Sequence, residues 1–245
     1  MNVLQVTGLE AGYGRERIVN GVSLRARRGE ITVIVGPNGS GKSTLMKAIT
    51  GVVKVFGGKV ELNGRDITRM PSTKLARAGV SYVPQVDNVF PSLTVLENLE
   101  MGGYVRKDGL EARIEELYDV FPDLRAAARR PARTLSGGQR NMLAMARALM
   151  IEPELLCIDE PTAGLSPVAG KRLWEQVLRV RDLGVAVLVI EQNTRQALAH
   201  ADYSYVLAMG ELRFEGTGAE LLASDKLIEL YVGAVRTGEE AAPRA

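Results

Sequence analysis

A glycine-rich loop stands between a β-branched run at residues 31–35 and a helix-like segment at residues 42–50. The loop reads Gly36, Pro37, Asn38, Gly39, Ser40, Gly41, Lys42 and Ser43. This is the pattern G-x-x-x-x-G-K-[ST], in the strand–loop–helix context that the pattern requires. Its backbone N–H groups and the helix dipole can bind phosphate oxygens, Lys42 can reach the β- and γ-phosphates, and the Ser43 hydroxyl can ligate Mg²⁺. The alternative is an ordinary glycine-rich turn before a helix.

Two acids, Asp159 and Glu160, follow a buried apolar run at residues 155–158. A carboxylate at the end of a buried strand needs a compensating interaction, because burial of a charge is costly. Binding of Mg²⁺ by the aspartate and activation of water by the glutamate would account for the two acids at this position. The alternative is a pair of exposed acids that cap a turn. The phosphate-binding loop in the same chain favours the metal and water roles.

The elements that must position these residues follow from hydrophobic periodicity. Apolar or alternating runs predict strands at residues 3–7, 31–35, 59–64, 79–83, 155–158 and 185–190. From about Ser92 to Met150 helical periods take over, which predicts a helical insert at about residues 90–152 between strands of one sheet. Asn63-Gly64 and Met209-Gly210 indicate hairpin turns, and Ser166-Pro167 a helix start. We expect a single domain over residues 1–235 and a disordered tail at 236–245.

Bulk composition excludes several classes of protein. The 245 residues carry 31 basic and 29 acidic side chains, so the net charge of +2 gives no argument for nucleic acid as a partner. The single cysteine allows no internal disulfide and favours a reducing compartment. No apolar stretch reaches the roughly 18 residues of a membrane span, and the start does not resemble a signal peptide. We expect any link to a membrane to go through a partner protein.

A further run, Leu135 to Gln139, lies between the glycine-rich loop and the two acids. Alone it is a short glycine-containing turn before a helix. Along the chain, the glycine-rich loop is followed by Gln85, then by the run Leu135–Gln139, and then by the strand that ends in two acids. This order of motifs resembles the nucleotide-binding subunit of an ABC transporter, and the resemblance covers about residues 4–216. The resemblance implies an α/β fold: a P-loop NTPase core with a mostly parallel sheet, an antiparallel β subdomain and a helical subdomain insert. It also implies ATP and Mg²⁺ as cofactors, and ATP hydrolysis as the activity.

In that family two ATPase subunits pack head to tail, and ATP lies between the loop of one and the signature run of the other. The resemblance therefore assigns to ATP held by the partner the residues Ser136, Gly137, Gly138 and Gln139. Ser136 and the two glycines open a helix, so their N–H groups and the helix dipole can face a γ-phosphate. The signature run thus predicts dimerisation.

Other roles come from the same resemblance. Tyr13 stands where the family stacks an aromatic ring on adenine, and Thr44 continues the ATP-binding loop. Gln85 stands at the loop that contacts Mg²⁺ or water, so the predicted metal ligands are Ser43, Gln85 and Asp159. A strand-edge tyrosine and a polar turn residue are the alternatives for Tyr13 and Gln85.

Two positions depart from the family pattern. Ser166 stands directly before Pro167, where the family commonly has an aspartate. Gln192 stands where the family has its switch histidine. Gln192 can still hydrogen-bond the γ-phosphate and orient water, so the predicted catalytic residues are Glu160 and Gln192. The only histidine, His200, is interpreted as a surface or packing residue.

Three further runs narrow the resemblance: residues 89–99, 189–193 and 227–233. Together they resemble the shorter ATPase subunit of branched-chain amino acid uptake systems. This implies a second, different ATPase, two membrane permeases and a solute-binding protein as partners. It also implies a cytoplasmic subunit, peripheral on the inner face of the plasma membrane. Related urea and amide importers, and a soluble ABC ATPase that acts on nucleic acid or ribosomes, stay open as alternatives.

Overall fold

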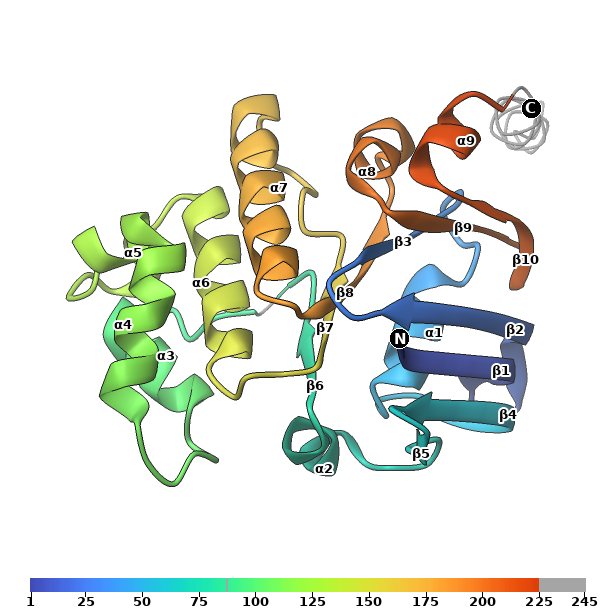
Figure 1. The fold of residues 1–245 in the computed structure, drawn as a ribbon, viewed down its shortest axis with the longest axis horizontal. Coiled ribbons are helices and arrows are strands. Elements are labelled where there is room, and N and C mark those ends of the chain that lie inside the picture. Colours follow the sequence, from blue (N-terminus) through green and yellow to red (C-terminus); the bar gives the residue numbers. More distant parts are fainter. Residues whose placement is uncertain (87, 225–245) are drawn as a thin grey trace, which may run out of the picture.

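Two sheets form the body of the molecule, which the computed structural model describes over residues 1–86 and 88–224 (Figure 1). The larger sheet has the order β10-β9-β3-β8-β7-β6, and the smaller one the order β2-β1-β4-β5. In the larger sheet β10 alone is antiparallel to its neighbour. The bounds are β1 (Asn2–Tyr13), β2 (Glu16–Arg27), β3 (Ile31–Val35), β4 (Lys54–Leu62), β5 (Arg65–Asp66), β6 (Val80–Val83), β7 (Leu155–Asp159), β8 (Ala186–Glu191), β9 (Tyr203–Ala208) and β10 (Glu211–Gly216).

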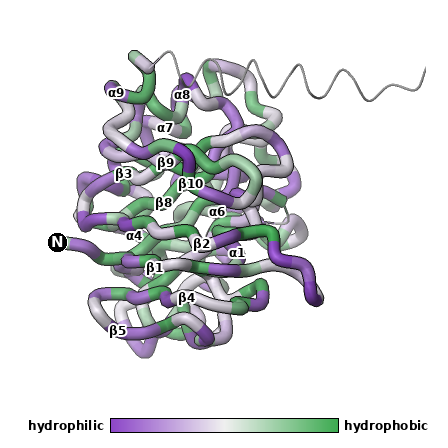
Figure 2. Tube along the Cα trace, turned by 90° about the vertical axis from the view of Figure 1, so that its right-hand side faces the viewer, coloured by the Kyte–Doolittle hydropathy of each residue, from purple (hydrophilic) through white to green (hydrophobic). Residues whose placement is uncertain are grey.

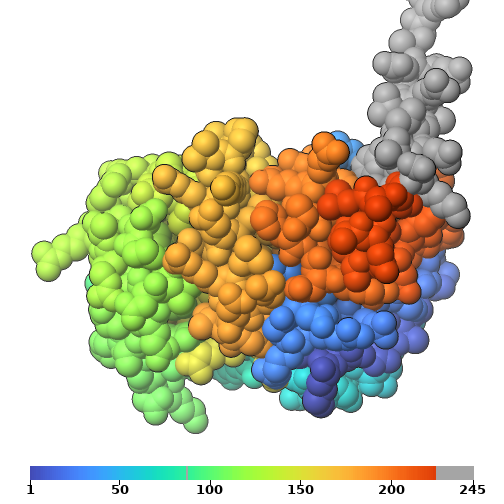
Figure 3. Space-filling model, turned by 45° about the horizontal axis from the view of Figure 1, so that its top comes forward, coloured from blue at the N-terminus to red at the C-terminus, as the bar shows by residue number. Residues whose placement is uncertain are grey.

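Helices cover the larger sheet, and a group of them lies on the side away from the smaller sheet (Figure 1). That group consists of α3 to α6, which follow β6 and precede β7 in the chain. The helix bounds are α1 (Lys42–Ile49), α2 (Ser72–Leu75), α3 (Val95–Gly102), α4 (Leu110–Val120), α5 (Pro122–Ala126), α6 (Gly137–Leu149), α7 (Pro167–Asp182), α8 (Thr194–His200) and α9 (Gly218–Leu222). In Figure 3, α7 separates the surface of this group from that of α8 and α9.

The parallel strands are buried on both faces, which explains their continuous apolar sequences. Every residue of β3 is buried. Val33 packs with the helices α3 to α7, whereas Ile34 packs with α1 and the smaller sheet. In Figure 2 hydrophobic segments accordingly run through the middle of the molecule and hydrophilic ones lie at its outer turns. Two hydrophobic cores therefore pack on opposite faces of the larger sheet.

The structure confirms the predicted α/β fold with a mostly parallel sheet and an antiparallel sheet. The hairpin turn is present, since Leu62 pairs with Arg65 and both Asn63 and Gly64 have positive φ. The helix start is also present: the Ser166 hydroxyl accepts a hydrogen bond from the Ala169 N–H at 3.3 Å.

The hairpin of β1 and β2 was not predicted. The strand predicted at residues 3–7 extends over all of β1, and its partner β2 was not predicted. Both strands contain polar residues and a glycine at positive φ, Gly8 in β1 and Gly21 in β2, which break the alternation that periodicity relies on. The predicted tail at 236–245 lies outside the described residues. Within those residues, no helix has the length and apolarity needed to span a membrane.

Candidate functional site

The glycine-rich loop joins β3 to α1 at the edge of the larger sheet where its parallel strands end. Gly36 has no room for a side chain, because a Cβ would meet the carbonyl oxygen of Leu207 in β9 at 2.0 Å. Gly41 precedes α1 with φ 99°, a left-handed conformation that favours glycine. Packing against β9 and the turn into α1 therefore both require the glycines of the motif.

The Lys42 side chain is buried inside this loop. Its ammonium donates hydrogen bonds to two carbonyl oxygens of the same loop, at 2.8 and 3.0 Å. Burial lowers the pKa of Lys42, and nearby carboxylates, first among them that of Glu160, oppose the shift. The buried Ser40 hydroxyl has no hydrogen-bond partner within residues 1–86 and 88–224. A buried cation and a free hydroxyl in a tight turn suit an anionic phosphate.

Asp159 lies beside this loop at the end of β7. It is paired with Ile190 of β8, which in turn is paired with Ile34 of β3, so the three strands end together. Its Oδ2 atom accepts a hydrogen bond from the Tyr82 hydroxyl at 3.1 Å. Its Oδ1 atom is buried without a partner among the residues that the structure describes. Burial raises the pKa of Asp159, and the Tyr82 hydrogen bond opposes that shift.

Glu160 follows in a strained backbone conformation. Its φ is 44°, unusual for a residue with a side chain, and its N–H donates to the Ile190 carbonyl at 2.9 Å. The Gln85 amide donates a hydrogen bond to Glu160 Oε2 at 2.8 Å. The two side chains thus meet although they are 75 positions apart in the chain.

Gln192 shares a cavity with Glu160. This cavity of about 440 Å³ is also lined by Thr162, Ser166 and Asn193. Gln192 follows directly after β8, and its side chain is exposed to the cavity. The structure therefore brings the two predicted catalytic residues to one cavity at the ends of β7 and β8.

The signature run lies elsewhere. The Ser136 hydroxyl accepts from the Gln139 N–H at 3.3 Å, and the Gln139 amide oxygen accepts from the Ser136 N–H at 3.1 Å, so the two form a capping box at the start of α6. Gly137 and Gly138 pack near Leu165 and Ala169 around the start of α7. In Figure 1, α6 is well apart from α1. One chain therefore does not bring the signature run to its own loop.

Tyr13 and Thr44 have contrasting surroundings. Tyr13 ends β1 with 48% of its surface exposed, so its ring is accessible to a planar ligand. Thr44 is buried within α1.

Three residues close to the site were not predicted: Tyr82, Glu191 and Thr162. The signal for Glu191 was present, since it is a second acid at the end of a buried strand, like Asp159.

Comparison with known proteins identifies the family. A family model described as ABC transporter matches residues 19–163, more than half of the chain. The chain belongs to the ABC transporter family. The expectation of an ABC ATPase is thereby confirmed.

Relatives within the ABC family match over nearly the whole chain. A probable branched-chain amino acid transport ATP-binding protein, LivF of Archaeoglobus fulgidus, is 45% identical over 95% of this chain and all of its own length. The high-affinity branched-chain amino acid transport ATP-binding protein BraG of Pseudomonas aeruginosa is 38% identical over 90% of this chain and 95% of its own. A nucleotide-free ATP-binding cassette from an ABC transporter has a TM-score of 0.83 at 31% identity, covering 94% of this chain and 99% of that cassette.

Proposed function

We propose that this ABC ATPase energises an importer of branched-chain amino acids. The proposal of solute rests on the names of the relatives from Archaeoglobus fulgidus and Pseudomonas aeruginosa. The proposal of the site rests on one observation: among the residues that the structure describes, a buried carboxylate oxygen of Asp159 has no partner, and it lies near the lysine of the phosphate-binding loop. An oxygen of that kind is suited to a cation that accompanies ATP.

The residues at this edge of the sheet suit Mg²⁺. The proposed ligands are the Asp159 carboxylate, the Ser43 hydroxyl and the Gln85 amide oxygen, all hard oxygen donors. No group of three or more His, Cys, Asp or Glu side chains suited to a metal occurs in the described part of the chain. Phosphate oxygens of ATP would therefore complete the coordination. When bound, the ion neutralises phosphate charge.

The remaining residues of the site perform the proposed chemistry. The Glu160 carboxylate accepts a proton from the attacking water, and Gln192, across the same cavity, orients that water. Lys42 leaves its loop carbonyls to stabilise the charge on the γ-phosphate. Gln85 holds Glu160 away from this role through their hydrogen bond until the Gln85 segment moves.

A second ATPase subunit completes the site. The start of α6 lies apart from this chain's own loop, and the N–H groups of Gly137 and Gly138 there suit the γ-phosphate held by that partner. Tyr13 is proposed to stack on adenine. We propose a different chain as the partner, in line with the subfamily that the sequence resembles.

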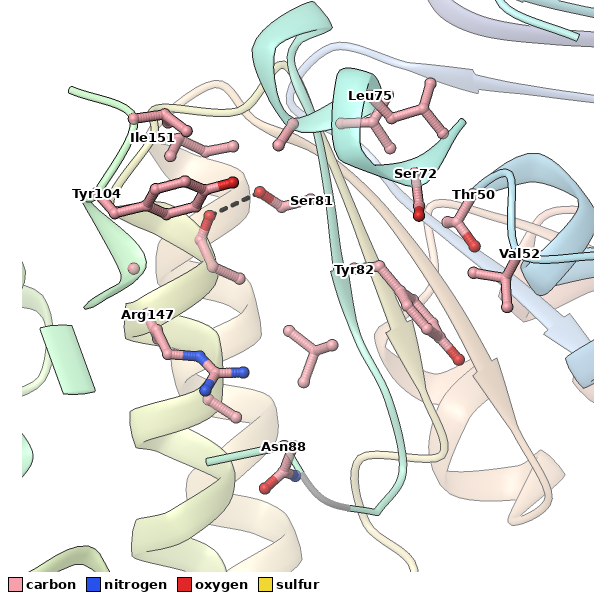
Figure 4. A pocket seen from close by; sticks show the side chains of 17 residues that line it. Thr50, Val52, Ser72, Leu75, Ser81, Tyr82, Asn88, Tyr104, Arg147 and Ile151 are labelled. Atoms are coloured by element: carbon pink, nitrogen blue, oxygen red, sulfur yellow. Dashed lines mark hydrogen bonds between the residues drawn. The ribbon is translucent and has the colours of Figure 1, made fainter. Parts of the chain in front are cut away.

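A groove next to Gln85 suits docking of a permease. It has a volume of about 250 Å³ and lies between α6, β6 and the segments around α2 and α3. Figure 4 shows Tyr104 and Arg147 on one side of β6, Tyr82 on the other side toward Thr50, and Asn88 on the segment that follows the strand. Tyr104 is 71% exposed, although aromatic rings are usually covered. Val83 and Asn88 of this lining flank Gln85 in the sequence, and Gln85 is hydrogen-bonded to Glu160, so a segment seated here can act on the catalytic carboxylate through Gln85.

This docking completes the proposed assembly. The helical subdomain at residues 90–152 supplies one wall of the groove and moves with the permease. The assembly contains two permeases, two ATPase subunits and a solute-binding protein, with this chain on the inner face of the plasma membrane. ATP binding closes the pair of ATPases, and hydrolysis reopens it.

Substitution of Glu160 by glutamine tests the assignment. In the assembled transporter, we expect ATP hydrolysis to fall by about 100-fold or more, since a general base is lost, while ATP still binds. Leucine-loaded binding protein should stimulate hydrolysis of the unaltered transporter, and urea should not. Glu111→Gln, an exposed glutamate of α4, is the matched control. An unimpaired rate of phosphate release in Glu160→Gln would disprove the role of Glu160.

Substitution of Tyr104 by serine tests the docking groove. We expect the affinity for detergent-purified permeases to fall about tenfold, the usual effect of truncating an aromatic anchor at an interface. ATP binding by the isolated subunit should be unchanged. Leu183→Ser, which also truncates an exposed apolar side chain, serves as the control. Equal affinity of the Tyr104 and Leu183 variants for the permeases would place the docking surface elsewhere.

A further inference from the structure

Glu191 is a buried acid that the proposed chemistry does not use. It is the last residue of β8 and is 2% exposed. Its Oε1 atom accepts hydrogen bonds from the N–H and the hydroxyl of Thr162, at 3.0 and 2.7 Å. Its Oε2 atom accepts from the N–H of Gln192 at 3.1 Å. One carboxylate thus binds the segments that follow two neighbouring strands.

Both segments carry a catalytic side chain. Thr162 lies two positions after Glu160, and Gln192 directly follows Glu191. A second link joins them, because the Glu160 N–H donates to the Ile190 carbonyl at 2.9 Å. Beyond Gln192, the Asn193 side chain caps α8 by accepting from the Gln196 N–H at 3.3 Å. Gln192 is therefore held on both sides by its neighbours in the chain, and it is an exposed residue that lines the cavity.

The chemistry of these contacts requires a carboxylate. Backbone N–H groups can only donate, and both oxygens of an ionised glutamate can only accept. Glutamine at this position would turn its NH₂ group toward an N–H donor. No salt bridge of Glu191 to a cation occurs within the described residues, so the buried charge is balanced mainly by these N–H and O–H donors. A buried charge is costly to the fold, and a positional role for Gln192 accounts for that cost.

We propose that Glu191 is a positioning residue, which locks the Thr162 segment to the backbone of Gln192 and so presents the Gln192 side chain to the water beside Glu160. This inference rests on the proposed role of Gln192. It adds a residue that touches neither ATP nor water but determines where a catalytic amide lies. The Thr162 segment and the Gln192 loop then move as one unit when the partner ATPase approaches the cavity that both line.

A double-mutant cycle on the assembled transporter tests the inference. We expect Glu191→Gln to lower kcat about tenfold, the effect of losing roughly one well-placed hydrogen bond to a charged group. KM for ATP should stay within about twofold, since Gln192 acts on the attacking water rather than on ATP binding. In a Gln192→Ala background, Glu191→Gln should lower kcat by less than about twofold, because its effect passes through Gln192.

Two further variants keep the test decisive. Glu175→Gln, an exposed glutamate of α7, makes the same chemical change outside the site and should leave kcat unaltered. If Glu191→Gln does not fold, Thr162→Val removes one donor to the same carboxylate. It should lower kcat by about threefold, and again not in the Gln192→Ala background.

The outcomes separate this inference from the proposed function. If Gln192→Ala lowers kcat and Glu191→Gln lowers it by the same factor in both backgrounds, Glu191 does not act through Gln192 and the inference is wrong. A raised KM with unchanged kcat would also overturn it. If Gln192→Ala alone leaves kcat unchanged, the role proposed for Gln192 fails and the inference fails with it.

Discussion

Two neighbouring strands, β7 and β8, each end in a buried acid, yet the two acids have opposite surroundings. Asp159 at the end of β7 keeps one buried oxygen without a partner among the described residues. Glu191 at the end of β8 uses both of its oxygens as acceptors for Thr162 and Gln192. Burial raises the pKa of both carboxyl groups. A free acceptor marks a place for a ligand, and a fully used one marks a part of the scaffold.

The largest expected effect of this difference concerns the dependence on Mg²⁺. We expect Asp159→Asn to lower Mg²⁺-dependent hydrolysis by about 100-fold or more, because a neutral amide is a poor ligand for a hard cation. Glu191→Gln should lower hydrolysis only about tenfold and leave the Mg²⁺ concentration for half-maximal rate unchanged. Titration of the hydrolysis rate with Mg²⁺ measures both quantities.

The comparison would fail if the two variants shifted the Mg²⁺ requirement equally. It would also fail if Asp159→Asn changed only the maximal rate, since its open oxygen would then have no part in metal binding. Binding of ATP in the presence of a chelator provides the control, and we expect it to persist in both variants.

A smaller effect is expected on the stability of the nucleotide-free protein. Burial raises the folded-state pKa of Asp159 above its unfolded-state value, so the ionised carboxylate weakens the fold at neutral pH. Without Mg²⁺, Asp159→Asn should therefore be more stable than the unaltered protein by about 1 kcal/mol at neutral pH. The gain should shrink as the pH falls through the folded-state pKa of Asp159, and it should vanish below about 3, where the carboxyl group is protonated in both states.

Urea unfolding in a chelating buffer, followed across this pH range, measures the free energy of unfolding. Glu191→Gln should show no comparable gain, because relief of the buried charge is opposed by an amide that faces N–H donors. A loss of stability in Asp159→Asn at neutral pH would show that the open oxygen has a partner and would remove the basis of the comparison.

Local sequence was sufficient for the parts of the site that are contiguous. The phosphate-binding loop and the two acids at the end of β7 were predicted because each motif carries its own chemistry and turn residues within a few positions. The hydrogen bonds from Tyr82 to Asp159 and from Thr162 to Glu191 were not predicted, because they depend on strand order and register. β6 pairs with β7, and β7 pairs with β8, although these strands are far apart in the sequence.

The first hairpin shows the same limit in the fold. β1 and β2 pair along their whole length through several register shifts, with polar residues on the exposed side. Periodicity detects a strand by strict alternation, and bulges interrupt that alternation. The buried strands β3, β7 and β8 were predicted because continuous apolar runs need no alternation.

The sequence by itself determined the membership of this chain in the ABC family and the nature of its phosphate-binding loop, since residue type and spacing are enough to specify both. Only the tertiary structure decided how the buried acids are used. A carboxylate becomes a candidate ligand or a support according to which donors surround it, and those donors come from other strands. The structure also places the signature run at α6 apart from the loop at α1, which supports the proposal that a second subunit completes the site.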